Sequence, residues 1–95
     1  QMESGILYGM SAALSGNIEI QGGAVKQSNF HDYTSVRMAA SPEINVEIFD
    51  SGAPTGGAGE PGTPPIVPAI TNAIYAAVGV RVRELPVAKQ GFNVA

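Results

Sequence analysis

Two segments of the chain carry apolar residues at the spacing of an α-helix. Between Gln1 and Gly16 an apolar side chain recurs every fourth residue, and the residues of this stripe are Ile6, Met10 and Leu14, with Leu7 beside them. A second stripe consists of Ile66, Ile70, Ile74 and Val78. This periodicity predicts one helix over 1–16 and another that starts near 65–67 and ends at Val78. The second helix has little polar face, so we expect it to be buried on more than one side.

Glycines give the first helix a further feature. Gly5 and Gly9 lie four residues apart on a face beside the apolar stripe. Because glycine weakens an isolated helix by up to about 1 kcal/mol, the pair indicates that another backbone approaches closely there. Gly16 and Gly79 follow the two predicted helices, where glycine commonly adopts the left-handed conformation that ends a helix.

Strand-like alternation fills part of the chain between the helices. Residues 17–28 form two short runs around a Gly-Gly pair at 22–23, which predicts a hairpin with a two-residue turn. The register pairs Ile20 with Val25 and Glu19 with Lys26. In residues 43–50 apolar and polar side chains alternate again, which predicts a third, half-buried strand. Residues 29–42 show no such period and are expected to form a loop that connects the hairpin to this strand.

The predicted order is therefore α-β-β-β-α. We expect an α+β fold in which two helices pack on one face of a small three-stranded antiparallel sheet. Residues 1–95 would make one small domain, because a chain of this length has room for a single, marginal core. The segment Arg81 to Val87 is expected to be extended.

The composition limits the classes of molecule that the chain is expected to bind. Charged residues make up 14% of the chain, against about 25% in typical proteins, so either other protein covers part of the surface or the chain is a poorly charged monomer. The net charge of −3 and the scattered basic residues argue against nucleic acid. No cysteine is present, which excludes disulfides and thiolate metal sites within the chain. No apolar run reaches about 18 residues, so neither a membrane span nor a targeting signal is expected.

One candidate for chemistry stands out, in the glycine- and proline-rich loop 51–65. Glu60 lies there in the sequence GGAGEPG, where glycine neighbours let the backbone approach a ligand. A carboxylate so placed can act as a general base. The alternative is an ordinary solvated glutamate, which residue type and spacing do not exclude.

Other candidates are weaker. His31 is the only histidine, in NFHDY, and a lone histidine is more typical of a turn or of packing than of catalysis. No catalytic triad and no metal-ligand spacing is recognisable. GGAGEPG lacks the lysine of a phosphate-binding P-loop and does not follow the Rossmann pattern.

Three segments together resemble one family. GGAGEPGTPPIVPAITNAIYAAVGVRVRELPV is similar to the C-terminal end of the molybdopterin-binding subunit of the xanthine oxidase and aldehyde oxidoreductase family. NFHDY followed by VRM resembles the branch that includes the isoquinoline 1-oxidoreductase β subunit. QMESGILYGMSAAL resembles the family's Gln-x-Glu-Gly helix, with Ser4 where the first glycine usually stands.

The resemblance implies a role for several residues. Glu60 would be the active-site base of a molybdenum hydroxylase that oxidises an aldehyde or an N-heterocycle, and Gln1 and Gly59 would contact the molybdopterin. The cofactor's own dithiolene sulfurs would hold the metal, and the electrons would leave through iron–sulfur clusters in a separate small subunit. The source would be bacterial, with the cytoplasm and the periplasm both open.

The family's subunit has several hundred residues, so the resemblance implies a C-terminal fragment. We expect the 95-residue chain to bind no cofactor and to be inactive alone, to self-associate as a dimer, and to present Glu60 to solvent on a mobile loop. The alternative is a non-enzymatic α+β interaction module whose glycine loop only links a strand to a helix.

Overall fold

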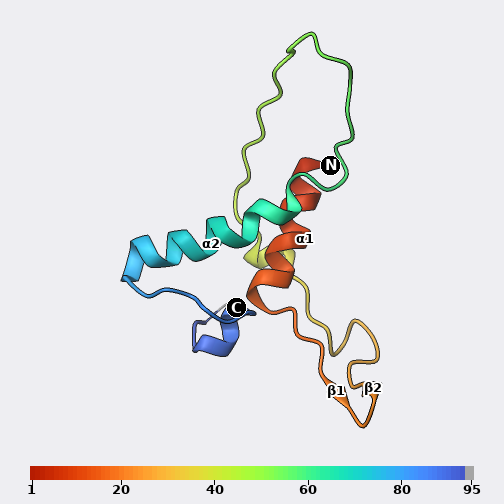
Figure 1. Ribbon diagram of the computed structural model, residues 1–95, viewed down its shortest axis with the longest axis vertical. Coiled ribbons are helices and arrows are strands. Elements are labelled where there is room, and N and C mark those ends of the chain that lie inside the picture. Colours follow the sequence, from red (N-terminus) through yellow and green to blue (C-terminus); the bar gives the residue numbers. More distant parts are fainter. Residues whose placement is uncertain (94–95) are drawn as a thin grey trace.

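The computed structural model describes residues 1–93, in which two helices cross while a hairpin and a long loop extend away from the crossing (Figure 1). Helix α1 spans Met2–Leu14 and helix α2 spans Thr63–Val78. The remaining elements are short, and in chain order they are β1 (Ile20–Gln21), β2 (Ala24–Val25), the 3-10 turn η1 (Met38–Ala40) and the 3-10 turn η2 (Val87–Gln90).

The predicted three-stranded sheet is wrong. Within the described residues the sheet has two strands, β1 and β2, and residues 43–50 are extended chain without a strand partner. Alternating side chains make a strand only where another strand pairs with it and a surface covers its apolar face, and here Ile48 and Phe49 are 90% and 80% exposed. The two helices pack on each other and not on the sheet, so only the coarse α+β description remains.

The hairpin has the predicted register. Ile20 pairs with Val25 in an antiparallel ladder, and Gly22 and Gly23 have φ values of 61° and 82°, as a tight two-residue turn requires. Just outside the ladder, Lys26 Nζ donates to Glu19 Oε2 at 2.8 Å, which confirms the predicted ion pair.

Two glycines of α1, Gly5 and Gly9, lie at the contact between the helices. The buried residues of α1 are Gly5, Gly9, Ser11 and Ala13, so the close approach predicted from the two glycines is confirmed. The predicted stripe of Ile6, Met10 and Leu14 is only half-buried. No residue of α2 is fully buried, which contradicts the expectation that other elements enclose this helix on several sides.

The helix ends differ in part from the prediction. Helix α2 begins at Thr63, earlier than expected, with Pro64 and Pro65 in its first turn, where a missing N–H costs nothing. Gly79 ends it in the left-handed conformation, as predicted, with φ of 71°. Gly16 does not adopt that conformation. A Cβ at Gly16 would lie 2.9 Å from Tyr33 Oη, so close packing and not backbone φ favours glycine there.

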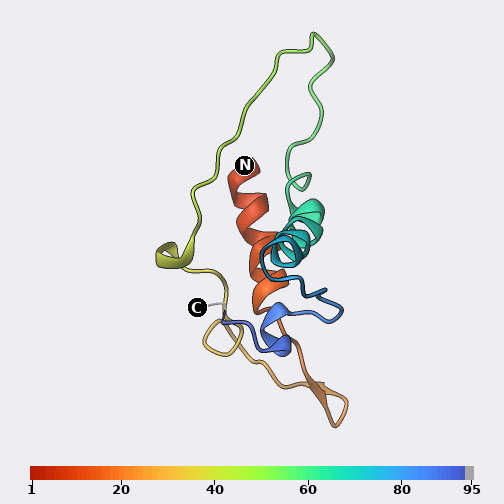
Figure 2. The same ribbon diagram turned by 90° about the vertical axis from the view of Figure 1, so that its left-hand side faces the viewer.

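The core is small. Ala13 and Val87 are the fully buried apolar residues of the described chain, where η2 packs against α1. Before α2 the long loop rises past the start of α1, away from both helices (Figure 2). The accessible surface is 7133 Å², against about 5,100 Å² for a compact monomer of this mass. No described helix has the length and apolar character needed to cross a membrane.

Candidate active site

A groove of about 500 Å³ lies between the start of α1 and the turn that leads into α2. It brings together three residues singled out from the sequence, namely Gln1, Gly59 and Glu60. The groove is lined on one side by the first turns of α1 and on the other by the glycine loop; the full set is Gln1, Ser4, Gly5, Tyr8, Gly59, Glu60, Thr63 and Pro64.

Gln1 reaches across this groove. Its side-chain Nε2 donates to the Gly59 carbonyl oxygen at 3.4 Å, a long and exposed hydrogen bond. The Gln1 backbone oxygen accepts from the Gly5 N–H at 3.0 Å, which places the residue at the N-terminal cap of α1. The amide is therefore held at the mouth of the groove, where it can both donate and accept.

Glu60 stands at the first position of a tight turn. Its backbone oxygen accepts from the Thr63 N–H at 2.9 Å, and the residue is exposed, as predicted. Because the main chain is held while the side chain is free, the carboxylate can reach a ligand in the groove.

The turn rests directly on α1. Gly62 is buried, and a Cβ there would lie 3.1 Å from the Met2 carbonyl oxygen. The Thr63 hydroxyl donates to the Gly5 carbonyl oxygen at 3.0 Å. The sequence Gly-Thr after Glu60-Pro61 thus supplies one residue small enough to touch the helix and one able to bond to it.

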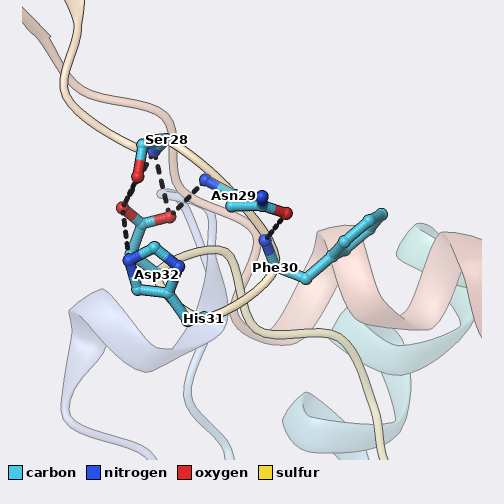
Figure 3. A network of polar contacts seen from close by, with 5 residues as sticks. All are labelled: Ser28, Asn29, Phe30, His31 and Asp32. Atoms are coloured by element: carbon cyan, nitrogen blue, oxygen red, sulfur yellow. Dashed lines mark hydrogen bonds and ion pairs between the residues drawn. The ribbon is translucent and has the colours of Figure 1, made fainter.

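His31 lies outside the groove, on an exposed turn (Figure 3). The neighbouring Asp32 carboxylate accepts from the Asn29 N–H at 3.0 Å and from the Ser28 N–H at 2.8 Å. These bonds, the Asn29 bond first, hold the pKa of Asp32 below its ordinary value. His31 Nε2 is 3.6 Å from Asp32 Oδ2, so its environment is that of a turn residue.

Five lining residues were not predicted as site residues, namely Ser4, Gly5, Tyr8, Thr63 and Pro64. Ser4 and Tyr8 follow Gln1 at intervals of three and seven residues, so helical periodicity could have placed them on the same face. Thr63 carried no such signal, because its role depends on how the turn docks. The described residues contain no group of three side chains suited to a metal ion.

A second groove of about 960 Å³ lies between the two helices and both 3-10 turns, and Met10, Leu14, Ile70, Ile74 and Val87 are among the residues that line it. These residues are mainly apolar. The groove contains neither Glu60 nor Gln1.

With this geometry described, the chain can be compared with known proteins, and it is similar to two oxidoreductases. It matches no protein-family model. It is 45% identical over 87 residues to the membrane-bound aldehyde dehydrogenase [pyrroloquinoline-quinone] of Gluconacetobacter polyoxogenes, which covers 92% of this chain. It is 40% identical over 86 residues to the isoquinoline 1-oxidoreductase subunit beta of Brevundimonas diminuta, which covers 90%.

The predicted resemblance to the branch of the isoquinoline 1-oxidoreductase β subunit is therefore confirmed. The chain spans 11% of the length of each of these two curated relatives. Both relatives are oxidoreductases by name, and the chain is similar to one part of each.

Proposed function

We propose that this chain is the segment of a bacterial molybdenum hydroxylase that supplies the active-site base, Glu60. The observation that carries the proposal is the shared groove, in which Gln1, Gly59 and Glu60 meet although Gln1 and Gly59 are 58 positions apart in the sequence. The names of the two relatives support oxidation of an aldehyde or an N-heterocycle as the reaction.

The residues of the groove fit a molybdopterin. The Gln1 amide and the Gly59 backbone would hold its polar edge, because both offer hydrogen-bonding groups at the open side of the groove. The cofactor of the resembled family carries its own metal ligands, so the protein side of the site needs no ligand cluster. When bound, this cofactor supplies the two-electron oxidation of the substrate carbon.

Glu60 would accept the proton that this oxidation requires. Its carboxylate is exposed to the groove while the turn holds its backbone, so it can reach a reacting group without carrying the loop along. General bases of this kind contribute about 10²- to 10⁴-fold to rate. The rest of the subunit would complete the pocket, and a small iron–sulfur subunit would receive the electrons. The isolated 95-residue chain would be inactive.

The test is Glu60→Gln in the full-length subunit. We expect turnover of isoquinoline or acetaldehyde to fall at least about 100-fold, because the amide cannot take up the proton, while the molybdenum content stays unchanged. Glu47→Gln is the matched control, since Glu47 is an exposed carboxylate outside the groove. Retained activity in Glu60→Gln would show that the base lies elsewhere.

The cofactor itself can be identified directly. The Gluconacetobacter relative is named for pyrroloquinoline quinone, so that quinone is the alternative to molybdopterin. Metal analysis and acid extraction of the purified full-length protein separate the two. We expect about one molybdenum per subunit and no extractable quinone, and the reverse result would replace molybdopterin in this proposal.

A further inference from the structure

We propose that Thr63 is a positioning residue that fixes Glu60 relative to α1, and with it relative to Gln1. The inference rests on the proposed role of Glu60 as the base. Thr63 also lines the groove, but in this role it acts on the reaction through Glu60 and not by direct contact with the reacting atoms. Its effect on the reaction would come through the hydrogen bonds and contacts that follow.

Thr63 is bonded in two directions. Its backbone N–H donates to the Glu60 carbonyl oxygen at 2.9 Å, and its hydroxyl donates to the Gly5 carbonyl oxygen at 3.0 Å. The second bond joins residues 58 positions apart and is partly buried, so water competes with it less than with a surface bond. Thr63 thereby links the turn that carries Glu60 to the first helix.

Close packing gives this link a defined geometry. Gly9 faces the same residue from one turn further along α1, and a Cβ at Gly9 would lie 2.5 Å from the Thr63 carbonyl oxygen. Gly62 packs against α1 on the other side, where a Cβ would lie 3.1 Å from Ile6 Cγ1. The backbone on both sides of the Thr63 hydroxyl therefore has little freedom to shift along α1.

The loop before Glu60 makes few other interactions that could fix the position of Glu60. Among the described residues of 43–59, the hydrogen bonds of the loop are internal, such as Gly52 N–H to Asp50 Oδ1 at 3.0 Å. The exception is the exposed bond from Gln1 to Gly59, at 3.4 Å. Without the Thr63 hydroxyl, the position of Glu60 would depend on that long bond and on contact alone.

The experiment replaces Thr63 in the full-length subunit with its cofactor and small subunit bound. Thr63→Val keeps the shape and removes the hydroxyl, and we expect kcat to fall about tenfold or more, because small misplacements of a reacting group can cost up to about 10²-fold. KM for isoquinoline or acetaldehyde should change less than about twofold, since ground-state binding is not altered. Thr63→Ser keeps the hydroxyl and should retain kcat within about threefold.

A matched control lies in the same helix. The Thr71 hydroxyl donates to the Pro68 carbonyl oxygen at 3.2 Å, a bond within α2 that does not reach α1. Thr71→Val therefore removes the same group without touching the link, and its kcat should equal that of the unmodified subunit. Cofactor content and melting temperature are measured for each variant, so that loss of folded protein is separated from loss of rate.

The outcomes distinguish this inference from the proposed function. If Glu60→Gln is inactive while Thr63→Val has normal kcat, Glu60 is the base and Thr63 does not position it. If Thr63→Ser is as slow as Thr63→Val, bulk and not the hydroxyl matters, and the inference is overturned. If Thr63→Val does not fold, Thr63→Cys replaces it. Its thiol is a weak donor, so its kcat should lie below that of Thr63→Ser, and equal values would contradict the inference. Activity in Glu60→Gln would refute the proposed function instead.

Discussion

The helix crossing and the loop 43–59 use similar residues in opposite ways. At the crossing, Gly9 brings two backbones so close that a Cβ on it would lie 2.5 Å from the Thr63 carbonyl oxygen. In the loop, Gly56 and Gly57 have nothing within 4 Å of an added Cβ. The apolar Ile48 and Phe49 point into solvent there.

The difference shows which part of the chain is packed by its own residues and which part is not. The crossing fixes the Glu60 turn with contacts that the chain itself supplies, whereas the loop carries apolar side chains for which the described chain has no cover. Exposed apolar groups in such number indicate surface that other protein covers. The candidate site thus lies between the packed helix crossing and a loop whose apolar side chains remain exposed.

The largest effect is expected from breaking the crossing. Gly9→Ala places a methyl group against the backbone of α2, which cannot move aside as a flexible side chain would. Overpacking of this kind costs about 1–3 kcal/mol. Gly5→Ala is the control, because its Cβ would meet ordinary contacts, the nearest at 3.4 Å from Thr63 Oγ1. It should be neutral or stabilising by up to about 1 kcal/mol, as alanine favours helix. Thermal unfolding followed by circular dichroism measures both, and equal stabilities would contradict the close contact.

The second prediction concerns the uncovered surface. The chain exposes about 2,000 Å² more than a compact monomer of its mass, which exceeds the roughly 800 Å² per partner that a standard interface buries. We therefore expect the isolated 95-residue chain to form a dimer. Sedimentation velocity from about 10 µM to 1 mM would show the mass rising toward twice 9.7 kDa.

The matched variants for self-association lie on α2. Ile74→Glu puts a charge on the wall of the larger, apolar groove and should shift the midpoint of association to at least about tenfold higher concentration. Ala76→Glu adds the same charge outside that groove, on an exposed position, and should shift it less. A chain that stays monomeric at 1 mM would refute the dimer.

The smallest effect is expected in the turn of residues 28–32, outside both regions. Its order depends on the ionised Asp32 carboxylate, whose pKa the Asn29 and Ser28 N–H groups lower. A lowered pKa in the folded chain means that this stabilisation is present above the ordinary aspartate value of about 3.9. It is lost as the pH falls through the lowered pKa. The amide NMR signals of Ser28 and Asn29 should shift with a midpoint below about 3.9, and Asp32→Asn should abolish the shift. A midpoint at or above that value would contradict the bonding seen here.

Sequence patterns predicted the local parts of this fold well. Helical stripes located both helices, and the Gly-Gly pair gave the register of Ile20 and Val25. These features depend on neighbours in sequence. The strand over 43–50 was wrong because alternation describes only the segment itself. It does not show whether a partner strand and a covering surface exist.

Part of the candidate site could likewise be predicted from the sequence. Glycine and glutamate in one loop marked Glu60, and the family resemblance added Gln1 and Gly59, which the structure brings into the same groove. The hydrogen bond of Thr63 to α1 and the packing of Gly62 against α1 could not be inferred. Both depend on a contact between segments almost sixty residues apart. No periodicity records such a contact.

The hydrogen bond from the Thr63 N–H to the Glu60 carbonyl oxygen also fixes the number of residues between these two positions. The loop before Glu60 is under no such constraint. Between Glu60 and Thr63, an inserted residue would break the turn and displace α2 along α1. Before Glu60, residues 43–58 have no hydrogen bond to the helices, so insertions and deletions there would leave the groove in place. Evolution could thus reshape the covering of this site by changing loop length, while the carboxylate kept its position.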